Sequence, residues 1–393
     1  MKIRLITTLA LLVSACLPGI AKQPDQRRPL EIAGADASIR EAHVTGPRYS
    51  APEVFRGGED FHNPRIERFR QQYDFLKVIQ DEPNDFSKIL KLRHWVHRQW
   101  PIDDEQSFSG DAFAILQHAH DTGEGFHCAH AMTVQYAVLT ASGYVARNLG
   151  IDRSHAKFGR SFHHGINEVW SNDHAKWVAL DAKYDIHFER HGVPLSALEL
   201  HESLRNDDGQ DVQMVKGVER RPVPRPEPHE YGGRIDSYWW VAWHVRSDSF
   251  TQPHFSGVSS MVIWDNEAFR NDTWYRGGGD SLAKHWAYAA GAFIPIAQRQ
   301  RIEWTPGVVS LGRTIQVEPG RLRVEPRSST PNLELYRYQI DDAPWQPLEA
   351  GDSIDWPLVH GVNTLRLRTQ NRFGVQGPIA AVEVVADLAE PSS

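Results

Sequence analysis

Three residues, Cys128, His164 and Asp181, are of the types that nucleophilic catalysis requires. A cysteine attacks an acyl carbonyl when an imidazole takes its proton and a carboxylate holds the other ring nitrogen. The chain contains only two cysteines, Cys16 and Cys128, and lipidation of Cys16 would leave Cys128 without a disulfide partner. A lone thiol in an exported protein is either buried or used in chemistry. The simpler alternative is a small buried cysteine that opens a core helix.

The residues around Cys128 predict a helix that positions the thiol. Residues 129–142 contain neither Gly nor Pro and place apolar side chains at helical spacing at Met132, Tyr136 and Leu139. Gly143 is a natural cap for the end of this helix. Cys128 is therefore expected at a helix N-terminus, where unpaired N–H groups and the helix dipole favour the reactive thiolate.

His164 and Asp181 flank a predicted β-hairpin. Residues 165–170 and 176–181 have the pattern of strands, and the turn-forming residues 171–174 join them. His164 opens the first strand and Asp181 closes the second, so antiparallel pairing brings both to the same end of the hairpin. The interval between Cys128 and His164 leaves room for one more strand.

These segments resemble the transglutaminase-like superfamily over about residues 90–185. Residues 143–147 (Gly-Tyr-Val-Ala-Arg) resemble its Gly-Ile-Pro-Ala-Arg element, 164–170 (His-Gly-Ile-Asn-Glu-Val-Trp) its His-Ala-Trp-x-Glu strand, and 177–181 (Trp-Val-Ala-Leu-Asp) its Trp-Val-x-x-Asp strand. The resemblance implies an α+β, papain-like thiol enzyme without a cofactor. It also implies attack on an amide or acyl bond of a peptide or protein, with Cys128 as nucleophile, His164 as base and Asp181 as orienter. Hydrolysis is favoured over cross-linking.

The chain departs from the family pattern at three places. Gly125 lies one residue further from the cysteine than usual, Gly165-Ile166 replaces Ala-Trp, and Ala182-Lys183 stands where Pro-Thr often follows the aspartate. The second departure removes an aromatic wall of the family's cleft.

An oxyanion formed during such an attack needs hydrogen-bond donors, and the backbone N–H of Cys128 is the first of them. Family members add an aromatic or amide side chain from upstream, for which Gln99 and Trp100 are the candidates. The alternative is that Trp95 and Trp100 are core residues of a helix that begins near Phe86.

The chain length of 393 residues predicts two domains with flanking segments. We expect a signal peptide over 1–16, a tether over 17–51, the transglutaminase-like domain over 52–302 and a small β-sandwich over 303–393. The last segment resembles immunoglobulin-like modules, and its strands are expected at 314–317, 333–338, 364–368 and 380–385.

The N-terminus predicts export. Lys2 and Arg4 precede an apolar run over 5–15 that is too short to span a bilayer, and residues 12–16 (Leu-Val-Ser-Ala-Cys) resemble a bacterial lipobox. We expect a lipoprotein anchored to a membrane through Cys16, in the periplasm or at the cell surface; ordinary cleavage after Ala15 is the alternative. The net charge of −7 comes without a basic patch, which argues against a nucleic-acid partner.

Two other functions compete with catalysis. A zinc site could use the imidazoles near Cys128, those of His118, His120, His127 and His130, but a second cysteine is missing and no metal is expected. A peptide- or glycan-binding lipoprotein on the same fold could use tryptophans such as Trp239, Trp240, Trp243, Trp274 and Trp286. A binding module would have no use for Cys128, His164 and Asp181 together.

Overall fold

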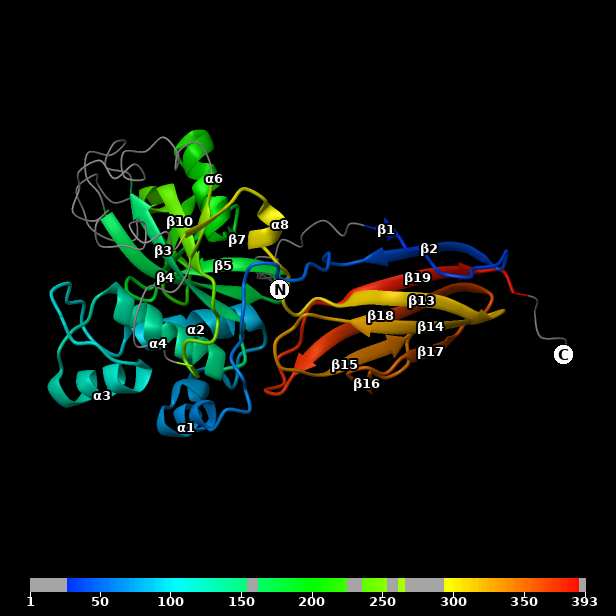
Figure 1. Ribbon diagram of the computed structural model, residues 1–393, viewed down its shortest axis with the longest axis horizontal. Coiled ribbons are helices and arrows are strands. Elements are labelled where there is room, and N and C mark those ends of the chain that lie inside the picture. Colours follow the sequence, from blue (N-terminus) through cyan, green and yellow to red (C-terminus); the bar gives the residue numbers. More distant parts are fainter. Residues whose placement is uncertain (1–26, 154–161, 225–234, 253–260, 266–292, 389–393) are drawn as a thin grey trace, which may run out of the picture.

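The computed structural model describes residues 27–153, 162–224, 235–252, 261–265 and 293–388. A domain of helices and sheets lies beside an elongated β-sandwich (Figure 1). The predicted signal peptide with Cys16 lies outside the described residues, as do Trp274 and Trp286. Within the described ranges, the helices are all too short or too polar to cross a membrane.

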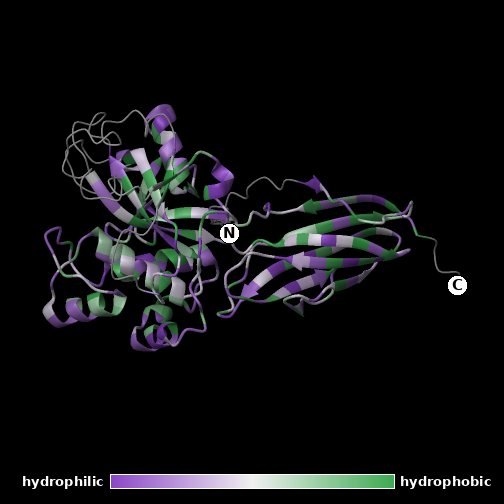
Figure 2. Ribbon diagram, in the orientation of Figure 1, coloured by the Kyte–Doolittle hydropathy of each residue, from purple (hydrophilic) through white to green (hydrophobic). Residues whose placement is uncertain are grey.

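The first domain has a layer of helices in which one helix, α4, is buried among the others. They are α1 (Pro64–Gln72), the 3-10 helix η1 (Phe75–Ile79), α2 (Asp85–His97), α3 (Ala112–Thr122) and α4 (Cys128–Ala141). Side chains of Asn63, Asn84 and Asp111 cap α1, α2 and α3, which accounts for where these helices begin. Most residues of α4 after its first turn are buried, whereas α1 is largely hydrophilic (Figure 2). Helix α4 is therefore the core element of this layer.

The main sheet packs against α4 and has the strand order β12-β11-β10-β3-β4-β5. Its strands are β3 (Ala146–Arg153), β4 (Phe162–Ser171), β5 (Lys176–Leu180), β10 (Trp240–His244), β11 (Met261–Trp264) and β12 (Phe293–Ile296). The antiparallel pairs β3–β4 and β4–β5 confirm the predicted hairpin and the single strand between it and α4. Only β11 and β12 run parallel among the paired strands described for this sheet.

A smaller sheet, β7-β6-β8-β9, continues from the hairpin. It comprises β6 (Ile186–Arg190), β7 (Val193–Pro194), β8 (Gln213–Lys216) and β9 (Arg221–Val223). Near it lie α6 (Ala197–Asp207), the 3-10 helix η2 (Ile235–Trp239) and the short α8 (Arg299–Ile302). Ser196 and Glu199 form a capping box at the start of α6.

The second domain is a sandwich of a six-stranded sheet, β1-β2-β19-β18-β15-β16, and a three-stranded sheet, β13-β14-β17. Its strands are β1 (Arg28–Pro29), β2 (Ile39–Thr45), β13 (Ser310–Glu318), β14 (Arg321–Arg327), β15 (Leu333–Ile340), β16 (Gln346–Glu349), β17 (Ile354–Pro357), β18 (Gly361–Asn371) and β19 (Ala380–Ala386). Burial alternates along β18 and β19, and hydropathy alternates in bands along the sandwich (Figure 2). The predicted α+β domain followed by a β-sandwich is thus confirmed.

The expected tether over 17–51 is wrong where it covers β2. This strand pairs with β19 from Ile39 to Thr45, and Figure 1 shows it beside the last strand of the chain. Ile39, Ala42 and Val44 pack against the sandwich core, but charged residues interrupt their alternation, so the sequence shows no sustained strand period. The sandwich is therefore completed by a segment that precedes the first domain in sequence.

The boundary expected at 303 also lies slightly too early. Trp304 and Val308 are buried in the core of the first domain, and the backbone carbonyl of Trp304 accepts a 2.7 Å hydrogen bond from the indole of Trp177. The sandwich core begins with Val309 and Leu311. Packing therefore places the change of domain near residue 308.

The two domains meet at the C-terminal end of α4. The side-chain amide of Asn371 donates a 2.7 Å hydrogen bond to the carbonyl of Gly143, and the ring of Phe373 stacks on that of Phe61 at 5.0 Å. Gly143 has a φ of 93°, and a Cβ there would lie 3.0 Å from a methyl carbon of Val375. Glycine both ends the helix and lets the sandwich approach it.

Candidate active site

Cys128 is the first residue of α4, and His127 is the N-cap residue before it. The Nδ1 atom of His127 accepts a hydrogen bond of 3.2 Å from the backbone N–H of Ala129. The thiol therefore lies where the unpaired N–H groups of a helix favour negative charge. This is the position that the sequence predicts.

The turn that carries the thiol is held against the segment that follows α2. The N–H of Phe126 donates to the carbonyl of Pro101 at 3.0 Å, and the N–H of Asp103 donates to the carbonyl of Phe126 at 3.2 Å. A Cβ on Gly125 would lie 2.4 Å from the carbonyl oxygen of Pro101. Only glycine fits this close approach. This gives a reason why the glycine lies one residue further from the cysteine than in the family pattern.

His164 and Asp181 meet at one end of the β4–β5 hairpin. The His164 Nε2 lies 2.7 Å from the Asp181 Oδ2, and both side chains are almost completely buried. The backbone of Asp181 exchanges two hydrogen bonds of 3.0 Å with Ile186, and its Oδ1 accepts a third from the N–H of Tyr184 at 3.2 Å. The carboxylate is thereby fixed in position to orient the imidazole.

The thiol and the imidazole shift each other's protonation. Burial alone would raise the pKa of Cys128, but hydrogen bonds from His127 and His164, the charge of His164 and the N–H of Gly165 lower it to about 4. Burial would lower the pKa of His164, but the charge and hydrogen bond of Asp181, with smaller contributions from Cys128, raise it to about 10. Between these pH values the pair is a thiolate and an imidazolium.

Gly165 permits this close approach of α4 to β4. It lies beyond the paired part of β4 and β5, which runs from Asn167↔Leu180 to Ser171↔Lys176. A Cβ on Gly165 would lie 3.2 Å from the Sδ of Met132 and 3.9 Å from the Cα of Ala129. The glycine that departs from the family pattern thus gives the first turn of α4 room to lie against the strand.

The two candidates for a side-chain oxyanion donor differ in their surroundings. The amide of Gln99 donates a 2.7 Å hydrogen bond to the carbonyl of Trp95 in the last turn of α2, so this donor is engaged. The ring of Trp100 packs edge-on against Phe126 at 5.3 Å, two residues before the thiol. Both Trp95 and Trp100 are partly buried against the helical core, but Trp100 lies beyond the end of α2 at His97, so the alternative holds for Trp95 alone.

A buried network without any local signal in the sequence supports the turn after Asp181. Arg93 is completely buried, and its Nε donates to the Asp185 Oδ1 at 2.8 Å while its Nη1 lies 2.8 Å from the Nδ1 of His187. The Nδ1 of His94 lies 2.7 Å from the other oxygen of Asp185. Asp185 adopts a φ of 55° in the turn whose ends are Asp181 and Ile186. Nothing in the local pattern around Arg93 points to a partner so distant in sequence.

The histidines near Cys128 have other partners than a metal. His130 lies 2.6 Å from the carbonyl of Phe108 through its Nε2, His118 lies 2.7 Å from Glu124, and His120 is exposed beside Asp121. In the described part of the chain, His, Cys, Asp and Glu form no group of three or more that could hold a metal ion.

The described tryptophans of the binding alternative are buried. Trp239, Trp240 and Trp243 belong to the interior of the first domain, and the indole of Trp243 donates a 2.7 Å hydrogen bond to Glu168. These three side chains are core residues and do not line an open groove.

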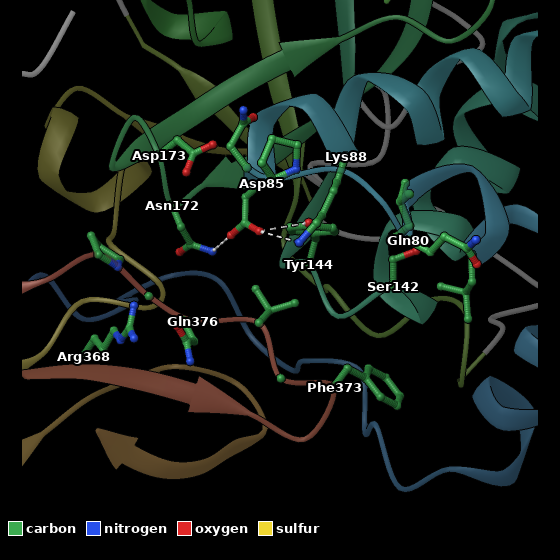
Figure 3. Close-up of a pocket in the computed structure, with 18 of the residues that line it drawn as sticks. Gln80, Asp85, Lys88, Ser142, Tyr144, Asn172, Asp173, Arg368, Phe373 and Gln376 are labelled. Carbon is green, nitrogen blue, oxygen red and sulfur yellow. Dashed lines mark hydrogen bonds and ion pairs between the residues drawn. The ribbon is translucent and has the colours of Figure 1, made fainter. Parts of the chain in front are cut away.

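A cavity of about 650 Å³ lies between the domains, at the opposite end of α4 from the thiol (Figure 3). Asp85 projects into it and accepts hydrogen bonds from the hydroxyl of Tyr144 at 3.3 Å and the amide of Asn172 at 3.1 Å. Ser142 and Tyr144 line it just beyond α4, and a helix of this length spans about 20 Å. This cavity is therefore separate from the site at Cys128.

Comparison with known proteins found a match to a family and similarity to solved structures. Residues 75–182, which include Cys128, His164 and Asp181, match the family described as the transglutaminase-like superfamily. Among solved structures, the chain is similar to the transglutaminase of red sea bream, with 10% sequence identity, a TM-score of 0.25, and coverage of 84% of this chain and 74% of that chain. The search of curated proteins found no match.

Proposed function

We propose that this chain, whose residues 75–182 match the transglutaminase-like superfamily, is a thiol enzyme acting on amide or acyl bonds. Cys128 is the nucleophile, His164 the general acid and base, and Asp181 the residue that orients His164. The observation that carries the proposal is the 2.7 Å contact of the His164 Nε2 with the Asp181 Oδ2, beside a Cys128 whose pKa the charge of His164 lowers.

In the first half of the reaction, the thiolate of Cys128 attacks the carbonyl carbon of the substrate. The negative charge passes from sulfur to the carbonyl oxygen, where the backbone N–H of Cys128 at the start of α4 can donate to it. The imidazolium of His164 then gives its proton to the leaving nitrogen, the C–N bond breaks, and a thioester remains on Cys128.

In the second half, the neutral His164 takes a proton from a water molecule, which attacks the thioester. The C–S bond breaks, a carboxylic acid leaves, and the proton returns the site to its thiolate–imidazolium state. A primary amine in place of water would give a new amide, which is cross-linking. We favour hydrolysis because it needs one bound substrate, whereas cross-linking needs a second bound one.

The proposed substrate is a peptide or protein, and the test is mass spectrometry of candidate peptides incubated with the enzyme. Peptides with glutamine side chains and cell-wall peptides are compared with and without added putrescine. Hydrolysis predicts cleaved or deamidated products in both samples, whereas cross-linking predicts putrescine adducts. Cys128→Ala is expected to abolish every product, and products that persist in this variant would contradict the proposal.

For the location of the enzyme, we propose export and anchoring through a lipid on Cys16. The lipobox pattern at residues 12–16 supports this, because cleavage before Cys16 would leave its thiol for acylation. The intact mass of protein extracted from membranes checks it. An unmodified N-terminus at Cys16 would remove the anchor and leave the proposed chemistry unaffected.

A further inference from the structure

Tyr184 lies against the imidazole of His164 from the turn between β5 and β6. The centroids of the two rings are 5.5 Å apart and the rings are tilted by 39°, a separation at which aromatic rings attract each other. The backbone N–H of Tyr184 also donates to the Asp181 Oδ1 at 3.2 Å, while the Oδ2 of the same carboxylate holds His164. One residue therefore contacts both partners of the His164–Asp181 hydrogen bond.

The preceding residue, Lys183, holds the tyrosine in place. Its ammonium nitrogen lies 4.9 Å from the centre of the Tyr184 ring and forms an ion pair with Asp104. The side chain of Lys183 is only 4% exposed, so its methylene stem is packed against protein. The backbone carbonyl of Lys183 lies 3.1 Å from the Nδ1 of His97, the last residue of α2. The turn is thus held both through a side chain and through its backbone.

Asp104 belongs to the segment that also supports the turn before Cys128. The N–H of the neighbouring Asp103 donates to the carbonyl of Phe126 at 3.2 Å, and Ile102 forms a β-bridge with Phe126. Lys183 therefore joins the segment beside the nucleophile to the turn beside the imidazole. It stands where the family pattern often has threonine, which carries no charge and could not form this ion pair.

The hydrogen bond between His164 and Asp181 is kept away from water, because the two side chains are only 2% and 6% exposed. An ionic hydrogen bond is stronger in such surroundings, and water that entered would weaken it. Ile166, which stands where the family pattern has tryptophan, is 1% exposed and belongs to the core. The aromatic ring beside the imidazole is therefore supplied by the turn after β5.

We propose that Tyr184 is a positioning residue for His164, which covers the His164–Asp181 hydrogen bond and is itself held by the Lys183–Asp104 ion pair. This inference rests on the proposed function. The task needs the aromatic ring and not the hydroxyl group. Phenylalanine should therefore replace Tyr184 without loss, whereas alanine should not.

The test is the proton NMR signal of the His164–Asp181 hydrogen bond, recorded at neutral pH on the full chain labelled with 15N-histidine. Such a proton resonates at lower field than backbone amide protons, and its loss in His164→Gln identifies it. In Tyr184→Ala, water should reach the hydrogen bond and speed exchange of the proton at least about tenfold, which broadens or removes the signal. Tyr184→Phe should keep the native signal. Lys183→Met should also speed exchange, whereas Lys77→Met, at an exposed lysine of η1, should not.

Other titratable groups act on the charge of His164 and stay constant in these variants. They are Asp181 after β5, Cys128 of α4 and His163 of β4. A purely structural role of Tyr184 would lower the melting temperature of Tyr184→Ala and leave the exchange of the proton in the folded protein unchanged.

A native exchange rate in folded Tyr184→Ala would overturn the inference, and so would the absence of the signal from the unmodified chain. A native rate in Lys183→Met would overturn the role of the ion pair. If Tyr184→Ala does not fold, Lys183→Met decides, because it leaves the tyrosine in the chain. The proposed function fails separately if Cys128 of the unmodified chain is alkylated with a midpoint near pH 8.5 while the NMR results are as expected.

Discussion

The pair formed by Cys128 and His164 consists of a half-buried thiol and a buried imidazole, and each stabilises the charge of the other. The pKa of Cys128 falls to about 4 and that of His164 rises to about 10, although burial acts against the charged form of both. Asp181 is the largest of the favourable influences on His164, through its charge and its 2.7 Å hydrogen bond. The charge state of the nucleophile thus depends on a residue that does not touch it in the proposed reaction.

Replacing His164 should change the pH dependence of the thiol. In His164→Ala the sulfur loses a hydrogen bond and the adjacent positive charge, so we expect the midpoint of Cys128 alkylation to rise from about 4 by at least about two pH units. The helix N-terminus and Gly165 keep it below the ordinary value of about 8.5. The measurement is iodoacetamide alkylation against pH, with His120→Ala as control. An unchanged midpoint would mean that His164 does not set the charge of Cys128.

Replacing Asp181 should change the alkaline side of the pH dependence, where His164 loses its proton. Asp181→Asn removes the charge that raises the pKa of His164, so the imidazolium should lose its proton at a pH lower by about one to three units. The thiolate–imidazolium pair, which extends up to about pH 10 in the native protein, would therefore end at a lower pH.

This change is measured as the upper limb of kcat/KM against pH for hydrolysis of p-nitrophenyl acetate. Asp342→Asn, an exposed change in the sandwich, serves as control. An upper limb that stays near its native position would show that Asp181 does not set the charge of His164.

The strands that carry the site are joined by a buried ion pair. Arg147 of β3 and Glu168 of β4 are cross-strand partners, and the Nε of Arg147 donates to the Glu168 Oε2 at 2.9 Å. Glu168 also accepts the N–H of Ala197 at the start of α6, and the Nη1 of Arg147 donates to the carbonyl of Ile302. These are the arginine and glutamate of the two family motifs, so the motifs mark a structural link between β3, β4, α6 and the end of the domain.

Glu168→Gln should destabilise the first domain. Arg147 is 1% exposed, and without the carboxylate its guanidinium would be a buried charge lacking its counterion. Breaking such a pair costs about 3 to 5 kcal/mol of the free energy of unfolding. Urea denaturation measures the loss, and the exposed Glu105→Gln should stay within about 0.5 kcal/mol of the native chain. A cost for Glu168→Gln below about 1 kcal/mol would contradict the assigned role.

The two domains are coupled at the end of α4 away from the thiol. Asn371 donates to the carbonyl of Gly143, and its side-chain oxygen accepts the N–H groups of Phe373 and Val375. Arg70 lies over the ring of Phe373 at 4.0 Å and donates to the carbonyl of Ala141. One loop of the sandwich thus supplies a hydrogen-bond donor at the end of α4 and covers the last turn of this helix, which begins at Cys128.

Asn371→Ala should loosen this contact. A buried carbonyl and two loop N–H groups lose their partner, which should cost at least about 2 kcal/mol of the free energy of unfolding. Hydrogen exchange should speed up at the C-terminal turn of α4, whereas the alkylation midpoint of Cys128, about 20 Å away, should not move. Asn206→Ala, on the exposed surface of α6, is the control. Unaltered exchange in Asn371→Ala would mean that the loop does not hold the helix.

Local pattern in the sequence was enough to place Cys128, His164 and Asp181 on their helix and strands. The helical run after Cys128, the cap at Gly143 and the hairpin over 164–181 all depend on neighbours within a few residues, so periodicity and turn residues report them. The alternating strands β15, β18 and β19 were predicted for the same reason.

Contacts between distant residues were decided only by the tertiary structure. The pairing of β2 with β19, the hydrogen bond from Asn371 to Gly143 and the burial of Arg93 against Asp185 join segments that no local period connects. Such contacts depend on the shapes of packed surfaces and on buried polar groups finding partners, and these exist only once the chain has folded. The sequence alone therefore determined which residues could react, whereas the fold determined what surrounds them.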